Sequence, residues 1–256
     1  MESLIAKEEI QVEGILPSKF SDGLFATFTK TPKPCCLIHN ISESPITKPL
    51  RIDGTFLVCF IEIPTTEPPD DTKSVIVIAM FPSSPFIRAF HVKDFEFREL
   101  LTTSFPSIQN GTAIALTSAK DVISFATTAP PNISSSLHMF RVRFSPQSST
   151  SISFEFLHSA NLDDFDASPE KPLVLSASEL AVWAAQGNRI NTFSLHDLSC
   201  RCSVEVPSAK SGSNIIKVVG LCCLCVMSTS AGEIFLVSLR CCNSSASIPA
   251  SAPLLS

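Results

Sequence analysis

The sequence contains no tyrosine, one tryptophan and only 8 glycines in 256 residues. So few glycines leave neither a G-x-G-x-x-G string nor a P-loop, the motifs whose backbone cradles phosphate groups. The serine-hydrolase string G-x-S-x-G is missing as well. Because binding surfaces commonly use tyrosine, this chain must make its contacts through phenylalanine, arginine or its loops. The sequence therefore carries no motif of nucleotide binding or of serine hydrolysis.

Charged residues are also sparse, at 17% of the chain, and the net charge is only −5. Soluble proteins average about 25% charged residues, so there is little charged surface to solvate. Such a composition suits a compact protein or one part of a larger assembly. Nucleic acid is excluded as a main partner, because no basic stripe is present to displace counterions.

Long hydrophobic runs are missing too. The most apolar stretch, residues 215–228, is interrupted by Lys217 and is too short to cross about 30 Å of hydrocarbon. We read it as two buried strands of a hairpin and expect no stable membrane insertion. The first residues contain no apolar segment of signal-peptide length. We therefore expect a cytoplasmic location.

Ten cysteines fall mostly in doublets and close pairs. Neighbouring strand residues point to opposite faces, so adjacent cysteines do not readily bridge each other, and reduced thiols are expected. Structural zinc sites usually use C-x2–4-C pairs, whereas Cys200 and Cys202, like Cys223 and Cys225, are spaced C-x-C. We predict no metal or other cofactor, and expect the cysteines to act as small apolar core residues.

What the chain does contain is a repeat, in which an apolar residue is followed by others three and five positions later. The copies are Ile87-x-x-Phe90-x-Val92, Met139-x-x-Val142-x-Phe144, Ile190-x-x-Phe193-x-Leu195 and Ile234-x-x-Val237-x-Leu239. They are separated by steps of 52, 51 and 44 residues. Strand-like repeats of this length are typical of β-propellers, in which each copy belongs to one blade.

Short runs rich in valine, isoleucine, phenylalanine and threonine alternate with turn residues along the whole chain. The predicted strands are 23–29, 35–41, 55–63, 74–80, 86–92, 96–101, 112–117, 121–127, 137–144, 151–157, 173–177, 179–185, 189–195, 201–206, 214–220, 222–228 and 233–240. In the repeat, the first and second apolar residues point to opposite faces of a strand, so both faces must be covered. Stacked blades provide that cover. A two-layer sandwich is the second choice, since it would show cleaner alternation.

The predicted fold class is therefore all-β, a WD40-like β-propeller with four to five recognisable blades. The propeller domain spans residues 1–240, with blades at 20–52, 55–101, 112–157, 173–206 and 214–240, and residues 241–256 form a disordered tail rich in serine, alanine and proline. The last blade lacks a convincing outer strand. Either residues 9–15 supply it and close the ring, or the ring is incomplete and further blades lie beyond one or both ends.

One loop is a candidate for binding. Residues 159–171 are acidic and lack apolar periodicity, which is typical of a solvated loop between blades. A functional interpretation makes the loop a linear docking segment for a basic groove, with Ser168-Pro169 as a site for a proline-directed kinase. The candidate residues are Asp163, Asp164, Phe165, Asp166 and Ser168.

No pattern of catalytic residues is evident. His91 and His138 lie inside predicted strands, where a core or edge role is expected. His196 and Asp197 are neighbours in a turn, and adjacent side chains there rarely point at each other. We therefore predict that the chain is not an enzyme. The alternative is a propeller enzyme or small-molecule binder that uses the central channel, which would need polar side chains on the inner strands.

Two segments carry a family resemblance. Residues 182–195 begin Val182-Trp183-Ala184-Ala185, and residues 215–239 contain the turn Thr229-Ser230-Ala231-Gly232. They resemble the degenerate WD40-type propeller near the C-terminus of Rho guanine-nucleotide exchange factors and of Jun-kinase-interacting scaffold proteins. The likeness covers about a quarter of the chain, and no Trp-Asp dipeptide is present. Neither a helical exchange domain nor a coiled coil is evident. The resemblance implies a non-catalytic module for protein–protein interaction in signalling, with unidentified protein partners.

Overall fold

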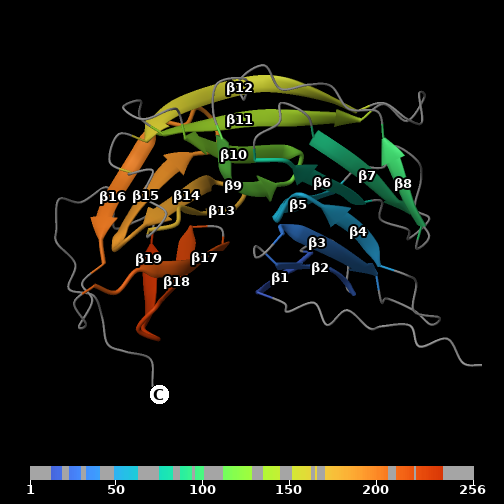
Figure 1. Cartoon of the computed structure of the whole chain (residues 1–256). Helices are drawn as coiled ribbons and strands as arrows, with labels where there is room; N and C mark the ends of the chain where they lie inside the picture. The colour runs from blue at the N-terminus through green and yellow to red at the C-terminus, as the bar shows by residue number, and fades with distance from the viewer. Residues whose placement is uncertain are drawn as a thin grey trace, which may run out of the picture.

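A computed structural model of the chain consists of antiparallel β-sheets arranged around an arc (Figure 1). The structure describes residues 13–18, 23–29, 33–40, 49–62, 75–82, 87–93, 96–100, 112–128, 135–144, 152–162, 165, 171–206, 212–221 and 223–238. Within these ranges every regular element is a strand. There are five sheets, each built from strands consecutive in sequence. We call them blades 1 to 5 in chain order.

The strands have the following bounds. Blade 1 contains β1 (Gly14–Pro17), β2 (Leu24–Thr29), β3 (Cys35–Asn40) and β4 (Leu50–Asp53). Blade 2 contains β5 (Leu57–Glu62), β6 (Val75–Met80), β7 (Ile87–Lys93) and β8 (Glu96–Leu100). Blade 3 contains β9 (Thr112–Ala119), β10 (Val122–Thr128), β11 (Ser135–Phe144) and β12 (Ile152–Leu162). Blade 4 contains β13 (Val174–Ala177), β14 (Ala181–Gln186), β15 (Arg189–Ser194) and β16 (Cys200–Glu205). Blade 5 contains β17 (Ile215–Leu221), β18 (Leu224–Thr229) and β19 (Ile234–Ser238).

The second strands of blades 2 and 4 explain why the blades stack. Every residue of β6 and of β14 is buried, so both faces of each strand are covered. A sheet that is apolar on both faces needs a neighbour on each side. The first two residues of each apolar triplet lie in the third strands of blades 2 to 5, β7, β11, β15 and β19; Leu195 follows the end of β15, and Leu239 lies outside the described residues. The predicted all-β propeller is confirmed, and the two-layer sandwich is not observed.

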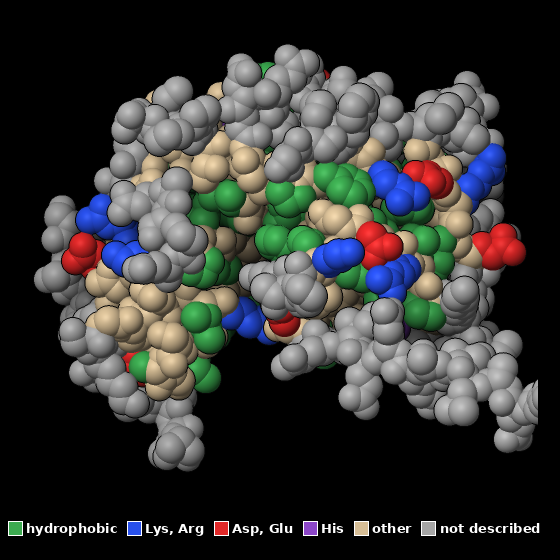
Figure 2. Space-filling model, viewed as in Figure 1, with side chains coloured by type: hydrophobic (Ala, Val, Ile, Leu, Met, Phe, Trp, Pro, Cys, Tyr) green, Lys and Arg blue, Asp and Glu red, His purple; other side chains and the backbone are tan. Residues whose placement is uncertain are grey.

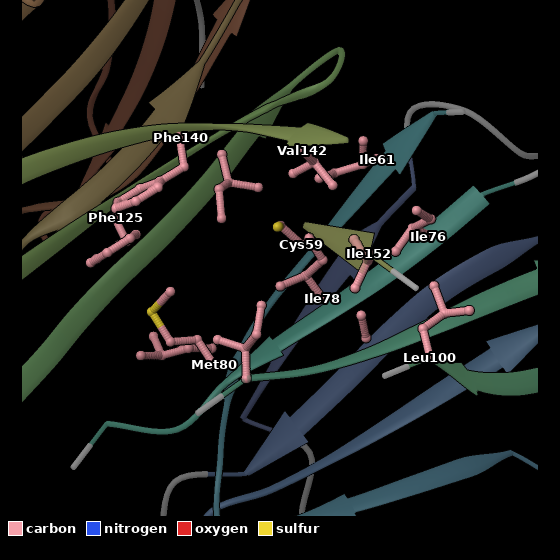
Figure 3. Close-up of a cluster of buried hydrophobic side chains, with 14 of the residues drawn as sticks. Cys59, Ile61, Ile76, Ile78, Met80, Leu100, Phe125, Phe140, Val142 and Ile152 are labelled. Carbon is pink, nitrogen blue, oxygen red and sulfur yellow. The ribbon is translucent and has the colours of Figure 1, made fainter. Parts of the chain in front are cut away.

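Four apolar clusters fill the spaces between successive blades. One joins blades 1 and 2, another blades 2 and 3, a third blades 3 and 4, and a fourth blades 4 and 5. Figure 3 shows the second of these, where Ile76 and Ile78 of β6 lie on the side of blade 2 that faces Phe125 and Phe140 of blade 3. Among the described residues no such cluster joins blade 5 to blade 1.

The structure bears on one of the two interpretations of the last blade, the one in which residues 9–15 supply its outer strand and close the ring. Gly14 and Ile15 instead pair with Phe28 and Thr27 of β2, so β1 belongs to blade 1. Residues 9–12 lie outside the described residues, as does the predicted tail at 241–256.

Residues 215–228 form two antiparallel strands, as predicted. β17 pairs with β18, and Val219 lies opposite Val226. Their lengths, 7 and 6 residues, are those of ordinary strands. In the part of the chain that the structure describes, no helix is long and apolar enough to span a membrane.

Of the described cysteines, Cys35, Cys36, Cys59 and Cys225 are core residues, whereas Cys200 is exposed and Cys202 and Cys223 are half-buried. Cys36, Cys59 and Cys225 are buried and free, and burial raises the pKa of each of the three thiols to about 12. Such thiols stay protonated, as expected of small apolar filler. Cys202, however, is disulfide-bonded. Its partner lies outside the described residues, since the other described cysteines are free. The expectation that all the thiols are reduced is therefore wrong for Cys202.

Candidate functional site

The predicted loop at 159–171 starts later than expected, because residues 159–162 are the end of β12; beyond them only Phe165 and Lys171 are described. The side chain of Phe165 is only 6% exposed and packs in the apolar cluster between blades 3 and 4. Its backbone N–H donates to the carbonyl of Leu162 at 3.0 Å, which turns the chain at the end of β12. Phe165 therefore anchors the loop rather than projecting from it. Asp163, Asp164, Asp166 and Ser168 lie outside the described residues.

His196 and Asp197 do not form a catalytic pair. The Asp197 carboxylate accepts hydrogen bonds from the backbone N–H of Ser199 at 3.0 Å and from the Ser199 hydroxyl at 2.7 Å. These bonds stabilise the carboxylate and lower its pKa to about 2. The backbone N–H of His196 donates to the Ser194 hydroxyl at 3.2 Å. This arrangement caps a turn between β15 and β16.

The innermost strands offer few polar groups, and hydroxyls on two of them bond to neighbouring blades. The Ser118 hydroxyl on β9 donates to the carbonyl of Phe60 in blade 2 at 2.7 Å. The Ser176 hydroxyl on β13 accepts from the backbone N–H of Gly220 in blade 5 at 2.9 Å. Both groups thus tie blades together. The described residues contain no group of three or more histidine, cysteine, aspartate or glutamate side chains that could hold a metal ion.

A phenylalanine, a threonine and a histidine form a cluster on blade 3. Phe125 and His138 lie directly opposite each other on β10 and β11, with ring centroids 5.3 Å apart. The Thr127 hydroxyl is 3.0 Å from Nε2 of His138. Desolvation by burial lowers the pKa of His138, which favours the neutral ring. Phe125 belongs to the cluster between blades 2 and 3, so this face of blade 3 meets blade 2.

Blade 1 carries the same arrangement. Phe25 and His39 lie opposite each other on β2 and β3 and stack with centroids 4.7 Å apart. The Thr27 hydroxyl is 2.9 Å from Nε2 of His39, and desolvation again lowers the pKa of the histidine. Leu24 and Ala26 of β2 pack against blade 2. Because side chains alternate along a strand, Phe25 and Thr27 point to the other face.

We call this other face the blade-1 open face. It carries Ile15, which is 61% exposed, and Leu37 directly across the sheet from Thr27. No described blade packs on it. The blade-1 open face is defined by Ile15, Phe25, Thr27, Leu37 and His39.

A second open face lies on blade 5. Cys225 and Met227 of β18 pack toward blade 4, so the alternate residues point away from it. On that side Val219, Val226 and Leu236 form a continuous cross-strand row. Leu221, Ile234 and Leu236 are 53%, 52% and 58% exposed. The blade-5 open face is defined by Val219, Leu221, Leu224, Val226, Ile234 and Leu236.

The two open faces border the same opening. In Figure 1 the strands of blades 1 and 5 lie on either side of the interruption in the arc. Figure 2 shows the molecule hollowed there, with hydrophobic side chains on the lobe at the lower left. The sequence analysis did not identify these residues. The repeated Phe-Ala-Thr string at 25–27 and 125–127, each followed by a histidine at 39 or 138, is the signal that would have found the blade-1 open face.

Comparison with known proteins identifies the fold. No protein-family model matches the sequence, and no curated protein sequence matches it. Among solved structures, KlAtg21 in complex with the coiled coil of AgAtg16 is similar over 89% of this chain and 66% of its own, with 8% identity and a TM-score of 0.53. Hsv2 of Kluyveromyces lactis is similar over 85% of this chain and 58% of its own, with 10% identity and a TM-score of 0.44. The WD40 domain of SCAP from fission yeast is similar over 88% of this chain and 52% of its own, with 10% identity and a TM-score of 0.45.

The chain spans less than two thirds of the length of these structures. At 8% identity, the likeness to KlAtg21 establishes the fold of this chain and says nothing about the activity of this chain.

Proposed function

We propose that this chain is a non-catalytic platform that binds other proteins. The observation that carries the proposal is the use of the inner-strand hydroxyls. Ser118 and Ser176 bond across blade junctions, so these groups hold the scaffold together instead of facing a substrate. A rigid body that displays its loops and edges is well suited to binding proteins. KlAtg21, a chain of the same fold, is itself seen with a coiled coil.

We further propose that the platform acts in the cytoplasm as the propeller part of a signalling scaffold or of a Rho exchange-factor-like protein. The support for this assignment is the resemblance of residues 182–195 and 215–239. The acidic loop that Phe165 anchors between blades 3 and 4 is the proposed docking segment, with Ser168 as its phosphorylation site.

The test is recovery of protein partners from cytosol with the purified 256-residue chain. A variant with Asp163→Asn, Asp164→Asn and Asp166→Asn removes three charges from the loop. We expect it to lose at least one basic partner that the wild-type chain retains. As a control, Asp53→Asn removes a charge from the exposed pair with Arg51 on blade 1 and should retain that partner. A chain that stays monodisperse and recovers no protein would contradict the proposal.

The alternative, a channel enzyme or small-molecule binder, is tested separately with a panel of hydrolase substrates and a metal-content assay. Turnover that survives repurification, and that is lost when an inner-strand residue is changed, would favour the alternative over the platform.

A further inference from the structure

We propose that the outer edge of β12 binds an extended segment of a protein partner, which adds a strand to blade 3. β12 is the last strand in the sheet order β12-β11-β10-β9, so among the described residues no strand pairs with its outer side. Such an edge presents a row of main-chain N–H and C=O groups, and a partner strand satisfies them. This inference rests on the proposed function, because it specifies where the platform binds a protein and in which conformation.

β12 differs from the last strands of the other blades in its length. It has 11 residues, whereas β4, β8, β16 and β19 have four to six. β11 pairs with it along its whole length, from Ser135 opposite Leu162 to Phe144 opposite Ile152. In Figure 1 the two strands run together along the top of the molecule, with β12 uppermost. A long edge forms more main-chain hydrogen bonds with a partner strand than a short edge does.

The composition of β12 also favours pairing. Proteins discourage the pairing of exposed edges with short strands, prolines and charged side chains, lysine above all. β12 contains no proline and no lysine, and its one acidic residue is Glu155. By contrast, β4 and β16 each carry an arginine and an acidic residue, and β8 carries three charged residues among its five. β19 is uncharged but has only five residues.

Both ends of β12 are fixed in the core. Ile152 is 2% exposed and belongs to the cluster between blades 2 and 3, whereas Leu162 is 1% exposed and belongs to the cluster between blades 3 and 4. Residues ten positions apart would share one face of a regular strand. A bulge at Leu157, where the register with Met139 and Phe140 shifts, reverses the alternation, and pairing with β11 continues on both sides of it. An edge that is already ordered loses little conformational entropy when it binds.

The side chains of β12 indicate what the partner strand carries. Phe156 is 54% exposed and meets the ring of Phe140 edge-on, with centroids 5.4 Å apart, so an apolar side chain is its favourable cross-strand neighbour. Glu155 accepts two hydrogen bonds from Arg143, at 2.9 and 3.1 Å, both on Oε2. Its Oε1 has no hydrogen-bond partner among the described residues and suits a basic side chain. The occupant is therefore an extended segment without proline, in which an apolar residue stands next to a lysine or arginine.

The experiment selects peptides that bind the 256-residue chain from a library of random linear peptides. We expect the enriched peptides to lack proline and to place an apolar residue next to a basic one. When a synthetic enriched peptide is added, amide hydrogen exchange measured by mass spectrometry should slow in fragments from β12 and stay unchanged in fragments from β16.

Two N-methylated versions of that peptide separate main-chain pairing from docking through side chains alone. One carries methyl groups on the odd-numbered main-chain nitrogens and the other on the even-numbered ones. Since alternate N–H groups of a strand point to opposite sides, one version should lose affinity about tenfold or more, and the other should bind like the parent peptide.

Substitutions on the chain locate the binding site. Phe156→Lys places a lysine on the edge and should lower the affinity for the peptide about tenfold, whereas Phe156→Leu should retain it. Glu155→Gln should remove the preference for a basic residue. Leu180→Lys is the control, because Leu180 is 52% exposed between β13 and β14 of blade 4. Circular dichroism verifies that all the variants fold.

Four results would overturn the inference. The library could enrich no peptide, the two methylated versions could bind equally, the slowed exchange could lie outside blade 3, or Phe156→Lys could bind the peptide like wild type. If Phe156→Lys recovers every cytosolic protein that the wild-type chain recovers, the platform function stands and the β12 edge fails as its docking site. If the peptide pairs with β12 as expected but the wild-type chain recovers no protein from cytosol, the pairing edge stands and the platform function fails.

Discussion

Trp183 is the only tryptophan of the chain and is fully buried against blade 5. Gly220 of β17 lies so close to it that an added Cβ would be 2.8 Å from the indole ring. A Cβ at that distance forces the ring or the strand to move. The small residue at 220 is therefore what allows blades 4 and 5 to approach each other.

Gly220→Ala should destabilise the fold by about 1–3 kcal/mol, the usual range for overpacking a core. Urea unfolding followed by circular dichroism measures the loss. In a Trp183→Phe background the same substitution should cost less, because the smaller ring leaves room for the added methyl group. An equal cost in both backgrounds would show that contact with the indole is not the cause.

Thiol reactivity should follow burial. Burial raises the pKa of the Cys36, Cys59 and Cys225 thiols to about 12, so almost no thiolate is present at pH 8. Iodoacetamide should label the exposed Cys200 in the folded protein and leave these three unmodified, as peptide mass spectrometry would show. Labelling of Cys59 at the rate of Cys200 would contradict its placement in the core.

The Asp197 turn should give a pH-dependent contribution to stability. Hydrogen bonds from Ser199 lower the folded-state pKa of Asp197 from 3.8 to about 2. A depressed carboxyl pKa stabilises the fold above the unfolded-state value, and the contribution is lost as the pH falls from about 4 to about 2. Asp197→Ala should therefore lower the melting temperature at pH 7. The difference from wild type should shrink as the pH approaches 2, and a constant difference would contradict the assignment.

At the scale of single residues, the sequence predicted the roles of some side chains and not of others. His138, in a predicted strand, lies on β11 and is half-buried, and Asp197 accepts hydrogen bonds within its own turn. Phe165 stands among acidic residues in the sequence, and no local pattern shows that it reaches the core between blades 3 and 4. Likewise Phe235 and Leu236 are both large and apolar, yet one packs toward blade 4 and the other is 58% exposed. Whether a strand residue is buried depends on whether another blade packs on its side of the sheet, and the local sequence does not show this.

Individual elements were predicted better than the contacts between them. Each of the 17 predicted strands overlaps an observed one, because period-2 apolar patterns are strong in this chain. β1 and β4 were missed. β1 has only four residues and ends in a proline, while β4 has an arginine and an aspartate among its four. Both gain their strand conformation by pairing with β2 and β3 rather than from local preference.

A blade junction depends on its buried hydrogen bonds as well as on its apolar contacts. The Ser176 hydroxyl on β13 accepts the backbone N–H of Gly220 in a buried position. Ser176→Ala leaves that donor without a partner, and we expect a loss of about 1–3 kcal/mol. Ser230 is the matched control, because its hydroxyl accepts the backbone N–H of Asn214 at an exposed position.

In Ser230→Ala, water replaces the lost acceptor, so its free energy of unfolding in urea should change far less. Equal losses in Ser176→Ala and Ser230→Ala would argue that the bond between blades 4 and 5 is not buried in solution.

At the scale of the whole molecule, the arc should not unfold as one unit. Among the described residues, blade 5 packs against blade 4 only, whereas blades 2, 3 and 4 each pack against two neighbours, so we expect blade 5 to unfold more easily. The emission of Trp183 reports the junction of blades 4 and 5, whereas far-ultraviolet circular dichroism reports all the sheets. We expect the fluorescence to shift to the red at a lower urea concentration than the loss of sheet signal. Coincident transitions would contradict this order.

The opening also determines how the molecule bears mechanical load. In a closed ring, tension between two neighbouring blades is shared by the two paths around the circle. Among the described residues, the apolar junctions connect blades 1 and 5 only through blades 2, 3 and 4, so tension between them passes through four junctions in series, as in a linear repeat array. The weakest junction then sets the force at which the arc yields.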